Sequence, residues 1–148
     1  MRIAVGNDHR GCELKVPVIS VIMDLGHFIH DFGCFTEDAV DYPDIAEKVA
    51  EGVIKGEFDM GILICGTGIG MCIAANKVRG IRAAQCHDVF TAHRARLHNN
   101  AQICCLAAEE DPAKVKVIVE DFIKTDYEGG RHQKRIDKIK EIEDRQCR

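Results

Sequence analysis

The chain of 148 residues is 46% hydrophobic and 30% charged, and its formal net charge is −4. This composition is typical of a globular protein and excludes a disordered chain, and the negative charge argues against a nucleic-acid-binding surface. No apolar run is long enough to cross a membrane, and the first residues read as a strand rather than a signal peptide. We therefore expect a cytoplasmic protein of one domain, residues 1–148, with no membrane or nucleic-acid partner.

Predicted strands and helices alternate along the chain. In order they are a strand at Arg2–Gly6, a helix at Gly11–Leu25, a strand at Phe28–Phe32, a helix from Asp44 to Gly56, a strand at Ile62–Ile64, a helix ending near Val78, a strand at Ile81–Cys86, a helix at Val89–Leu97, a strand at Ile103–Leu106 and a helix starting at Asp111-Pro112. This alternation predicts an α/β fold, a three-layer αβα sandwich with a five-stranded parallel, Rossmann-like sheet.

Local signals mark several element ends. Pro17 lies inside the first predicted helix, which must therefore start late or bend there. Asp44 is expected to cap the second helix, and Asp111 followed by Pro112 is a favourable helix start. Ligands of such folds bind beyond the carboxyl ends of the strands, where the sequence places Asp8, His9, Cys65, Thr67, His87 and Asp88.

A highly charged helix is predicted from about residue 130, after two glycines. Its apolar residues Ile136, Ile139 and Ile142 fall on one face only. That narrow stripe is typical of a solvated helix that lies across the body of the protein or across a partner subunit.

The eight cysteines contain no C-x-x-C pair. Several fall inside predicted strands, where cysteine behaves as a small hydrophobic residue. We expect free thiols in a reducing compartment rather than a disulfide scaffold. The cysteine spacings also argue against a zinc site.

Cys65 is the exception among these thiols, because it ends a buried apolar strand and precedes glycines at 66, 68 and 70. The glycines allow the backbone to approach a ligand closely, and a helix N-terminus favours negative charge. The stretch therefore offers a nucleophile or base beside a cradle for an oxyanion. A buried structural thiol is the simpler interpretation.

A dinucleotide site is a minor alternative for this glycine loop. The third glycine, Gly70, falls one position early for the G-x-G-x-x-G fingerprint, although Asp88 stands where a ribose-binding acid would fall. That fingerprint normally follows the first strand, where this chain has Asn7, Asp8 and His9.

Other polar residues each have an ordinary structural interpretation. Asp8 and His9 could form a strand-end turn, and His98 with Asn99 could cap a helix. Arg131 and Arg135 are expected on one helix face, as surface charge or as a clamp for phosphate.

Taken together, five strings resemble the type B ribose-5-phosphate isomerases, a family related to galactose-6-phosphate isomerase subunits. The strings are GNDHRGCELK, DYPD, GILICGTGIGMCIAANKVRGIRAA, HNNA and YEGGRHQKR. The resemblance extends from Arg2 to about Ile142.

The resemblance implies a cofactor-free aldose–ketose isomerase of the pentose phosphate pathway, acting on ribose 5-phosphate and ribulose 5-phosphate through an enediolate. Cys65 matches the general base, while Met71 stands where another branch has a glutamate base. The remaining matches are Asp8 and His98 for ring opening; Thr67, Gly66, Gly68, Ile69 and Gly70 for the anion hole; and His9, Asn99, Arg131 and Arg135 for substrate and phosphate contacts. Proton transfer by an acid–base pair also fits a sequence without metal-ligand spacings.

The resemblance further implies a homodimer with shared active sites, in which His98 acts on the neighbour's Cys65. A tetramer of two such dimers is an alternative. Two departures bear on the substrate: Gln102 replaces a usual asparagine, and Ala107-Ala108-Glu109 replaces a Gly-x-Arg whose arginine helps hold phosphate in part of the family.

We expect Glu109 either to turn away and pair with a cation such as Arg131 or Arg135, or to lie outside the pocket. A solvated glutamate that favours the helix start at Asp111-Pro112 by its charge is the simpler interpretation. Allose 6-phosphate and galactose 6-phosphate are alternative substrates, and a non-catalytic phosphosugar- or nucleotide-binding module is the alternative of another class.

Overall fold

The computed structural model describes residues 1–36 and 38–146, so Cys147 lies outside the described residues. The strands are β1 Arg2–Asn7, β2 Phe28–Asp31, β3 Met60–Cys65, β4 Ala83–Gln85 and β5 Ile103–Ala107. The helices are η1 His9–Gly11, α1 Cys12–Asp24, α2 Tyr42–Ile54, α3 Ile69–Ala75, α4 Val89–Asn99, α5 Pro112–Lys124, η2 Gly130–His132 and α6 Gln133–Gln146. None of these helices is both long and apolar enough to cross a bilayer.

The five strands form one sheet in the order β2-β1-β3-β5-β4, and each neighbouring pair is parallel. The predicted α/β fold is therefore confirmed. β3 lies at the centre of the sheet, and all six of its residues are buried. A strand covered on both faces carries a continuous apolar run rather than an alternating one.

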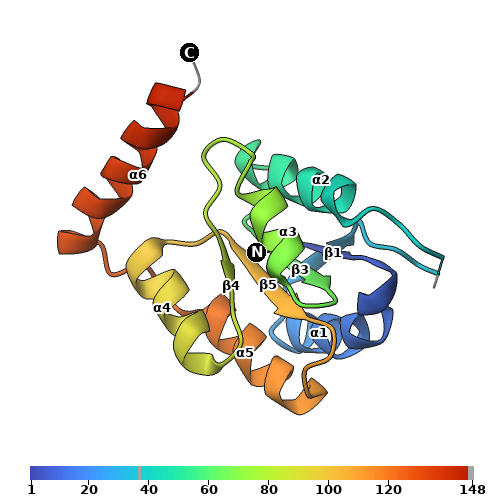
Figure 1. Ribbon diagram of the computed structural model, residues 1–148. Coiled ribbons are helices and arrows are strands. Elements are labelled where there is room, and N and C mark those ends of the chain that lie inside the picture. The colour runs from blue at the N-terminus through green and yellow to red at the C-terminus, as the bar shows by residue number, and fades with distance from the viewer. Residues whose placement is uncertain (37, 147–148) are drawn as a thin grey trace.

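Helices cover both faces of the sheet (Figure 1). One core cluster joins the sheet to α1, α4 and α5, and the other joins it to α2 and α3. Successive residues of a strand point to opposite faces. Ile62 and Ile64 accordingly belong to the first cluster, whereas Leu63 and Cys65 belong to the second.

Of two predicted helix starts, one is confirmed and the other is wrong. Asp111 caps α5 as predicted, because its carboxylate accepts a hydrogen bond from the backbone N–H of Ala113 at 2.9 Å. The prediction for α2 was wrong: the helix begins at Tyr42 after Asp41, and Asp44 lies within its first turn. Pro43 fits there because the first helical N–H groups have no intrahelical partner.

Other element bounds shift by a few residues. α1 contains Pro17 and starts at Cys12, so a late start was wrong. β4 and α3 are shorter than predicted. α6 reaches the loop before β4, where Glu143 accepts a hydrogen bond from the backbone N–H of Gly80 at 2.9 Å and Asp144 pairs with Arg79. Ile136 is buried, whereas Ile139 and Ile142 are about half exposed.

Candidate functional site

Cys65 is the last residue of the central strand, and its side chain faces the α2 and α3 layer. It stands opposite Ala107 in the register with β5, at the carboxyl edge of the sheet. Its exposed fraction is 4%. A reactive atom here is shielded from bulk water yet adjoins the loop that leads into α3.

The loop after Cys65 requires glycine for backbone reasons. Gly68 has φ +76°, and a Cβ atom there would lie 3.0 Å from the carbonyl carbon of Leu106. Thr67 shapes the loop by accepting a hydrogen bond from the N–H of Ile69 at 3.3 Å, and its carbonyl accepts one from the Gln85 amide at 2.5 Å. The loop thus brings its backbone close to the end of β5 without side chains between them.

Asp8 and His9 follow the neighbouring strand β1 at the same edge. The Asp8 carboxylate accepts hydrogen bonds from the backbone N–H groups of Arg10 and Gly11, at 3.0 and 3.2 Å, and so caps η1. The strand-end turn considered from the sequence is therefore present. The His9 ring accepts a hydrogen bond from the N–H of Val40 at 3.4 Å, which ties it to the loop before α2.

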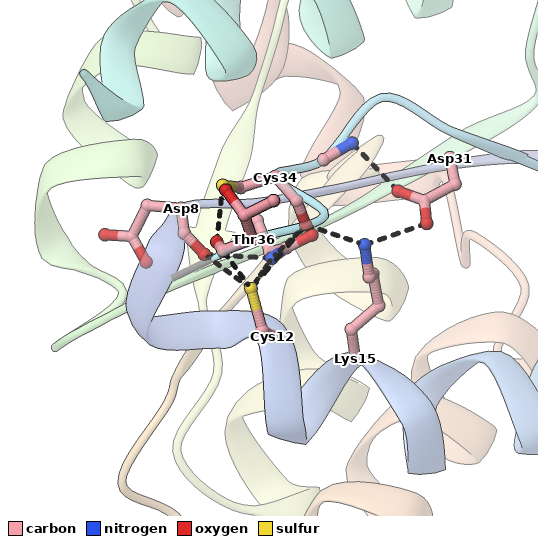
Figure 2. A network of polar contacts seen from close by, with 8 residues as sticks. Asp8, Cys12, Lys15, Asp31, Cys34 and Thr36 are labelled. Carbon is pink, nitrogen blue, oxygen red and sulfur yellow. Dashed lines mark hydrogen bonds and ion pairs between the residues drawn. The ribbon is translucent and has the colours of Figure 1, made fainter. Parts of the chain in front are cut away.

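A polar network fixes the backbone beneath Asp8 (Figure 2). The carbonyl of Cys34 is its centre: it accepts hydrogen bonds from the Lys15 ammonium at 3.0 Å and from the Cys12 thiol at 3.6 Å, and Lys15 also pairs with Asp31 at 2.9 Å. The Asn7 amide donates to the carbonyls of Asp8 and Cys34, at 2.9 and 3.1 Å. Figure 2 shows the Asp8 carboxylate pointing away from this network. The strand end is therefore held from behind while its carboxylate faces η1.

A second polar cluster contains His98, near the end of α4. The His98 and His132 rings stack with centroids 4.0 Å apart. Glu128 lies 3.1 Å from the Nε2 atom of His132 and 3.9 Å from that of His98. The Arg94 guanidinium lies 2.6 Å from Nε2 of His98. Desolvation, followed by the charges of His132 and Arg94, lowers the pKa of His98.

His98, Glu128 and His132 also place three possible metal ligands within 4.8 Å of one another. The two ring planes are within 15° of parallel and their centroids are 4.0 Å apart. Lone pairs that lie in two nearly parallel planes do not converge well on one ion. Arg94 already contacts one of these nitrogens, and the charge of Arg131 is also felt at His98. Although Glu128 adds one negative charge, a cation at this nitrogen would be repelled by both arginines.

The residues around Cys65 and the cluster around His98 lie at opposite edges of the sheet. α4 starts after the carboxyl end of β4 and returns to the start of β5, so His98 and Asn99 lie near the amino edge. The Arg82 side chain, just before β4, donates to the carbonyl of Asn99 at 2.9 Å. α4 has 11 residues, and a helix of that length spans about 16 Å. One chain therefore does not bring His98 to its own Cys65.

Several sequence interpretations need correction. Arg131 lies in η2 and Arg135 in α6, so they do not share one regular helix. Asp88 caps α4 by accepting a hydrogen bond from the N–H of Thr91 at 2.7 Å. These hydrogen bonds lower the pKa of Asp88, and they give it a structural role in place of the ribose contact considered earlier.

Glu109 pairs with Arg10, and neither Arg131 nor Arg135 is its partner. Sequence reasoning missed Arg10 altogether, although it directly follows His9. It also missed Arg94, whose spacing of four residues before His98 is a recognisable helical contact.

The seven cysteines that the structure describes are free thiols, as expected. Burial strongly raises the pKa of Cys104 and Cys105, which makes such thiols unreactive. Cys72 differs, because a hydrogen bond with Cys105 lowers its pKa to about 7. Cys72 lies on α3, and its thiol contacts the carbonyl of Ala83.

Comparison with known proteins places this architecture in a family. The chain is 45% identical over 144 residues to the Ribose-5-P isomerase B of Listeria innocua, with 97% of each chain covered. It is 41% identical to the D-erythrulose-4-phosphate isomerase of Pectobacterium atrosepticum, with 94% of this chain and 93% of that one covered. The structure of Ribose-5-phosphate Isomerase B from Mycoplasma genitalium with bound ribulose-5-phosphate superposes with a TM-score of 0.92 at 42% identity, covering 97% and 96% of the chains.

The sequence model of the family described as Ribose/Galactose Isomerase matches residues 3–139, nearly the whole chain. With relatives above 40% identity over almost their full length, the chain belongs to the ribose/galactose isomerase family.

Proposed function

We propose that the chain interconverts D-ribose 5-phosphate and D-ribulose 5-phosphate by proton transfer. The observation that carries this proposal is the buried thiol of Cys65 at the end of the central strand, beside a glycine loop held in a left-handed turn at Gly68. Relatives at 45% and 42% identity carry the name of this isomerase, which supports ribose 5-phosphate as the substrate.

In the proposed reaction, Cys65 removes the proton from C2 of the open-chain aldose, and the electrons move to the carbonyl oxygen at C1. The resulting enediolate is stabilised by backbone N–H groups of the loop from Gly66 to Gly70, because preorganised donors act strongly where water is excluded. The hydroxyl proton on the oxygen at C2 then passes to the oxygen at C1, and the thiol returns its own proton to C1, which leaves a ketone at C2 and a hydroxyl at C1. Asp8 and Thr67 lie at the same edge of the sheet. Asp8 assists opening of the sugar ring, and Thr67 holds the conformation of the loop.

We propose that a homodimer completes the site. His98, Asn99 and Arg131 lie at the sheet edge opposite Cys65, so a neighbouring chain has to supply them. The guanidinium groups of Arg94 and Arg131 suit the substrate phosphate, and Arg135 follows on α6. In this assembly His98 of one chain opens the sugar ring over the Cys65 of the other.

The proposed reaction belongs to the pentose phosphate pathway. The free thiols of the described residues suit a reducing compartment, and a cytoplasmic location is part of the proposal.

A second candidate is the same chemistry on another aldose phosphate. One relative at 41% identity is named for D-erythrulose 4-phosphate, and the family description includes galactose. The charge pair of Arg10 and Glu109 lies beside the glycine loop. The charges next to the loop therefore differ from those of relatives that carry an arginine in place of Glu109, and this difference bears on which sugar phosphate is bound.

A panel of sugar phosphates tests both candidates with the purified full chain. Ribose 5-phosphate, erythrulose 4-phosphate, allose 6-phosphate and galactose 6-phosphate are compared by kcat/KM. The proposal predicts the highest value for ribose 5-phosphate. A higher value for another sugar would reassign the substrate, and no turnover of any of them would leave a phosphosugar-binding module.

A further inference from the structure

Arg10 covers the first glycine of the loop that follows Cys65. A Cβ atom built on Gly66 would lie 2.9 Å from one terminal nitrogen of the Arg10 guanidinium and 3.3 Å from its central carbon. The backbone of Arg10 is fixed by its N–H bond to the Asp8 carboxylate at 3.0 Å. A positive charge is thus held against the loop by a residue from the neighbouring strand end.

Glu109 holds the other side of this guanidinium through an ion pair. Among residues 1–36 and 38–146, Glu109 is the one acceptor of hydrogen bonds from the Arg10 side chain. A guanidinium has five N–H donors, so most of them remain available to a ligand. The side chains of Arg10 and Glu109 are 53% and 73% exposed, which places the pair at the mouth of the site.

The buried position of Cys65 and the exposed position of Arg10 decide which part of a substrate each residue contacts. Cys65 is 4% exposed, so the reacting carbons must enter deeply. The phosphate is the most strongly hydrated part of the substrate and is mostly doubly charged at pH 7, so it fits best near the mouth. A planar guanidinium binds phosphate with two parallel hydrogen bonds, which makes it a well-matched partner.

We propose that Arg10 is a phosphate-binding residue of this site and that Glu109 is the positioning residue that holds it and partly neutralises its charge. The inference rests on the proposed function for the identity of the substrate. It follows that the strength of the Arg10–Glu109 pair sets how tightly this chain holds phosphorylated sugars.

The test measures binding of inorganic phosphate to the full chain by a ligand-observed phosphorus NMR titration, together with KM and kcat for ribose 5-phosphate. Arg10→Gln should weaken phosphate binding about tenfold, the worth of a charge-assisted hydrogen bond, and should raise KM similarly with kcat within about twofold. Glu109→Gln should tighten phosphate binding, and this gain should vanish in the double variant. Arg10→Lys keeps the positive charge but loses the planar group that makes two parallel hydrogen bonds. Its phosphate affinity should lie between that of Arg10→Gln and that of the unaltered chain.

Matched variants separate a local contact from net charge. Lys116→Gln removes one positive charge from the exposed face of α5, and Glu110→Gln removes one negative charge from a residue that pairs with Lys114 at 2.8 Å. Neither should change phosphate binding. Equal effects of Arg10→Gln and Lys116→Gln would overturn the inference, and so would a large loss of kcat with unchanged phosphate binding, because Arg10 would then act on the reacting carbons.

The inference and the proposed function fail separately. If no sugar phosphate is turned over but phosphate binding still depends on Arg10, the inference holds and the isomerase proposal fails. If ribose 5-phosphate is turned over and phosphate binding ignores Arg10, the inference fails alone.

Discussion

Mixing two inactive variants tests whether neighbouring chains share each active site. Cys65→Ala removes the proposed base, and His98→Ala removes the proposed ring-opening residue from the other edge of the sheet. The 11 residues of α4 span about 16 Å between the two edges of the sheet, so we expect His98 to be out of reach of Cys65 in its own chain. Each variant alone should be nearly inactive, because both pockets of its homodimer lack one essential group.

The expected recovery follows from the symmetry of a dimer. After full subunit exchange of equal amounts, about half of the dimers are mixed, and each mixed dimer has one intact pocket out of two. The mixture should therefore regain about a quarter of the unaltered specific activity. The assay is ribulose 5-phosphate formation after exchange has been verified by native mass spectrometry.

A double variant provides the control. A chain carrying both Cys65→Ala and His98→Ala, mixed with Cys65→Ala, has no way to build an intact pocket and should remain inactive. Verified exchange without any recovery from the two single variants would refute the shared site.

Three further predictions concern mechanism, charge and backbone. Turnover in heavy water should place solvent deuterium at C1 of the ketose, and EDTA should not inhibit; strict metal dependence without exchange would indicate hydride transfer. The His98 ring should titrate below the usual midpoint of a histidine because its pKa is lowered, so more of it is neutral at pH 7, and Arg94→Gln should move the midpoint upward in an NMR titration. Gly68→Ala should destabilise the fold by about 1–3 kcal/mol in urea denaturation, because alanine at φ +76° is strained, and a cost near zero would contradict the rigid turn.

The layout of the fold could be predicted because each signal was local. Apolar runs such as Ile62–Ile64 identified the strands, and Asp111 with Pro112 identified a helix start. Alternation of the elements then required a parallel sheet. The start of α2 was mispredicted because Asp41 and Asp44 are both suitable caps near one proline, and Pro43 is accommodated in the first turn of the helix.

The placement of residues at the edge of the sheet could be predicted where they follow strand ends. Asp8, His9 and Cys65 fall at one edge because parallel strands end together. Contacts between residues distant in sequence were beyond such reasoning: Arg10 and Glu109 are 99 positions apart, and the stacked rings of His98 and His132 join α4 to η2. Those contacts depend on side-chain paths across elements, for which the sequence carries no periodic signal.

The kinetics of Cys65→Ala with ribose 5-phosphate test the central claim most directly. Cys86, which follows β4 and is 1% exposed, gives the matched control Cys86→Ala for loss of a buried thiol. The account predicts that Cys65→Ala lowers kcat by about a hundredfold or more, the usual worth of a general base, while KM changes little and Cys86→Ala stays near the unaltered rate. A kcat for Cys65→Ala within a few-fold of the unaltered chain would contradict the assignment of Cys65 as the base.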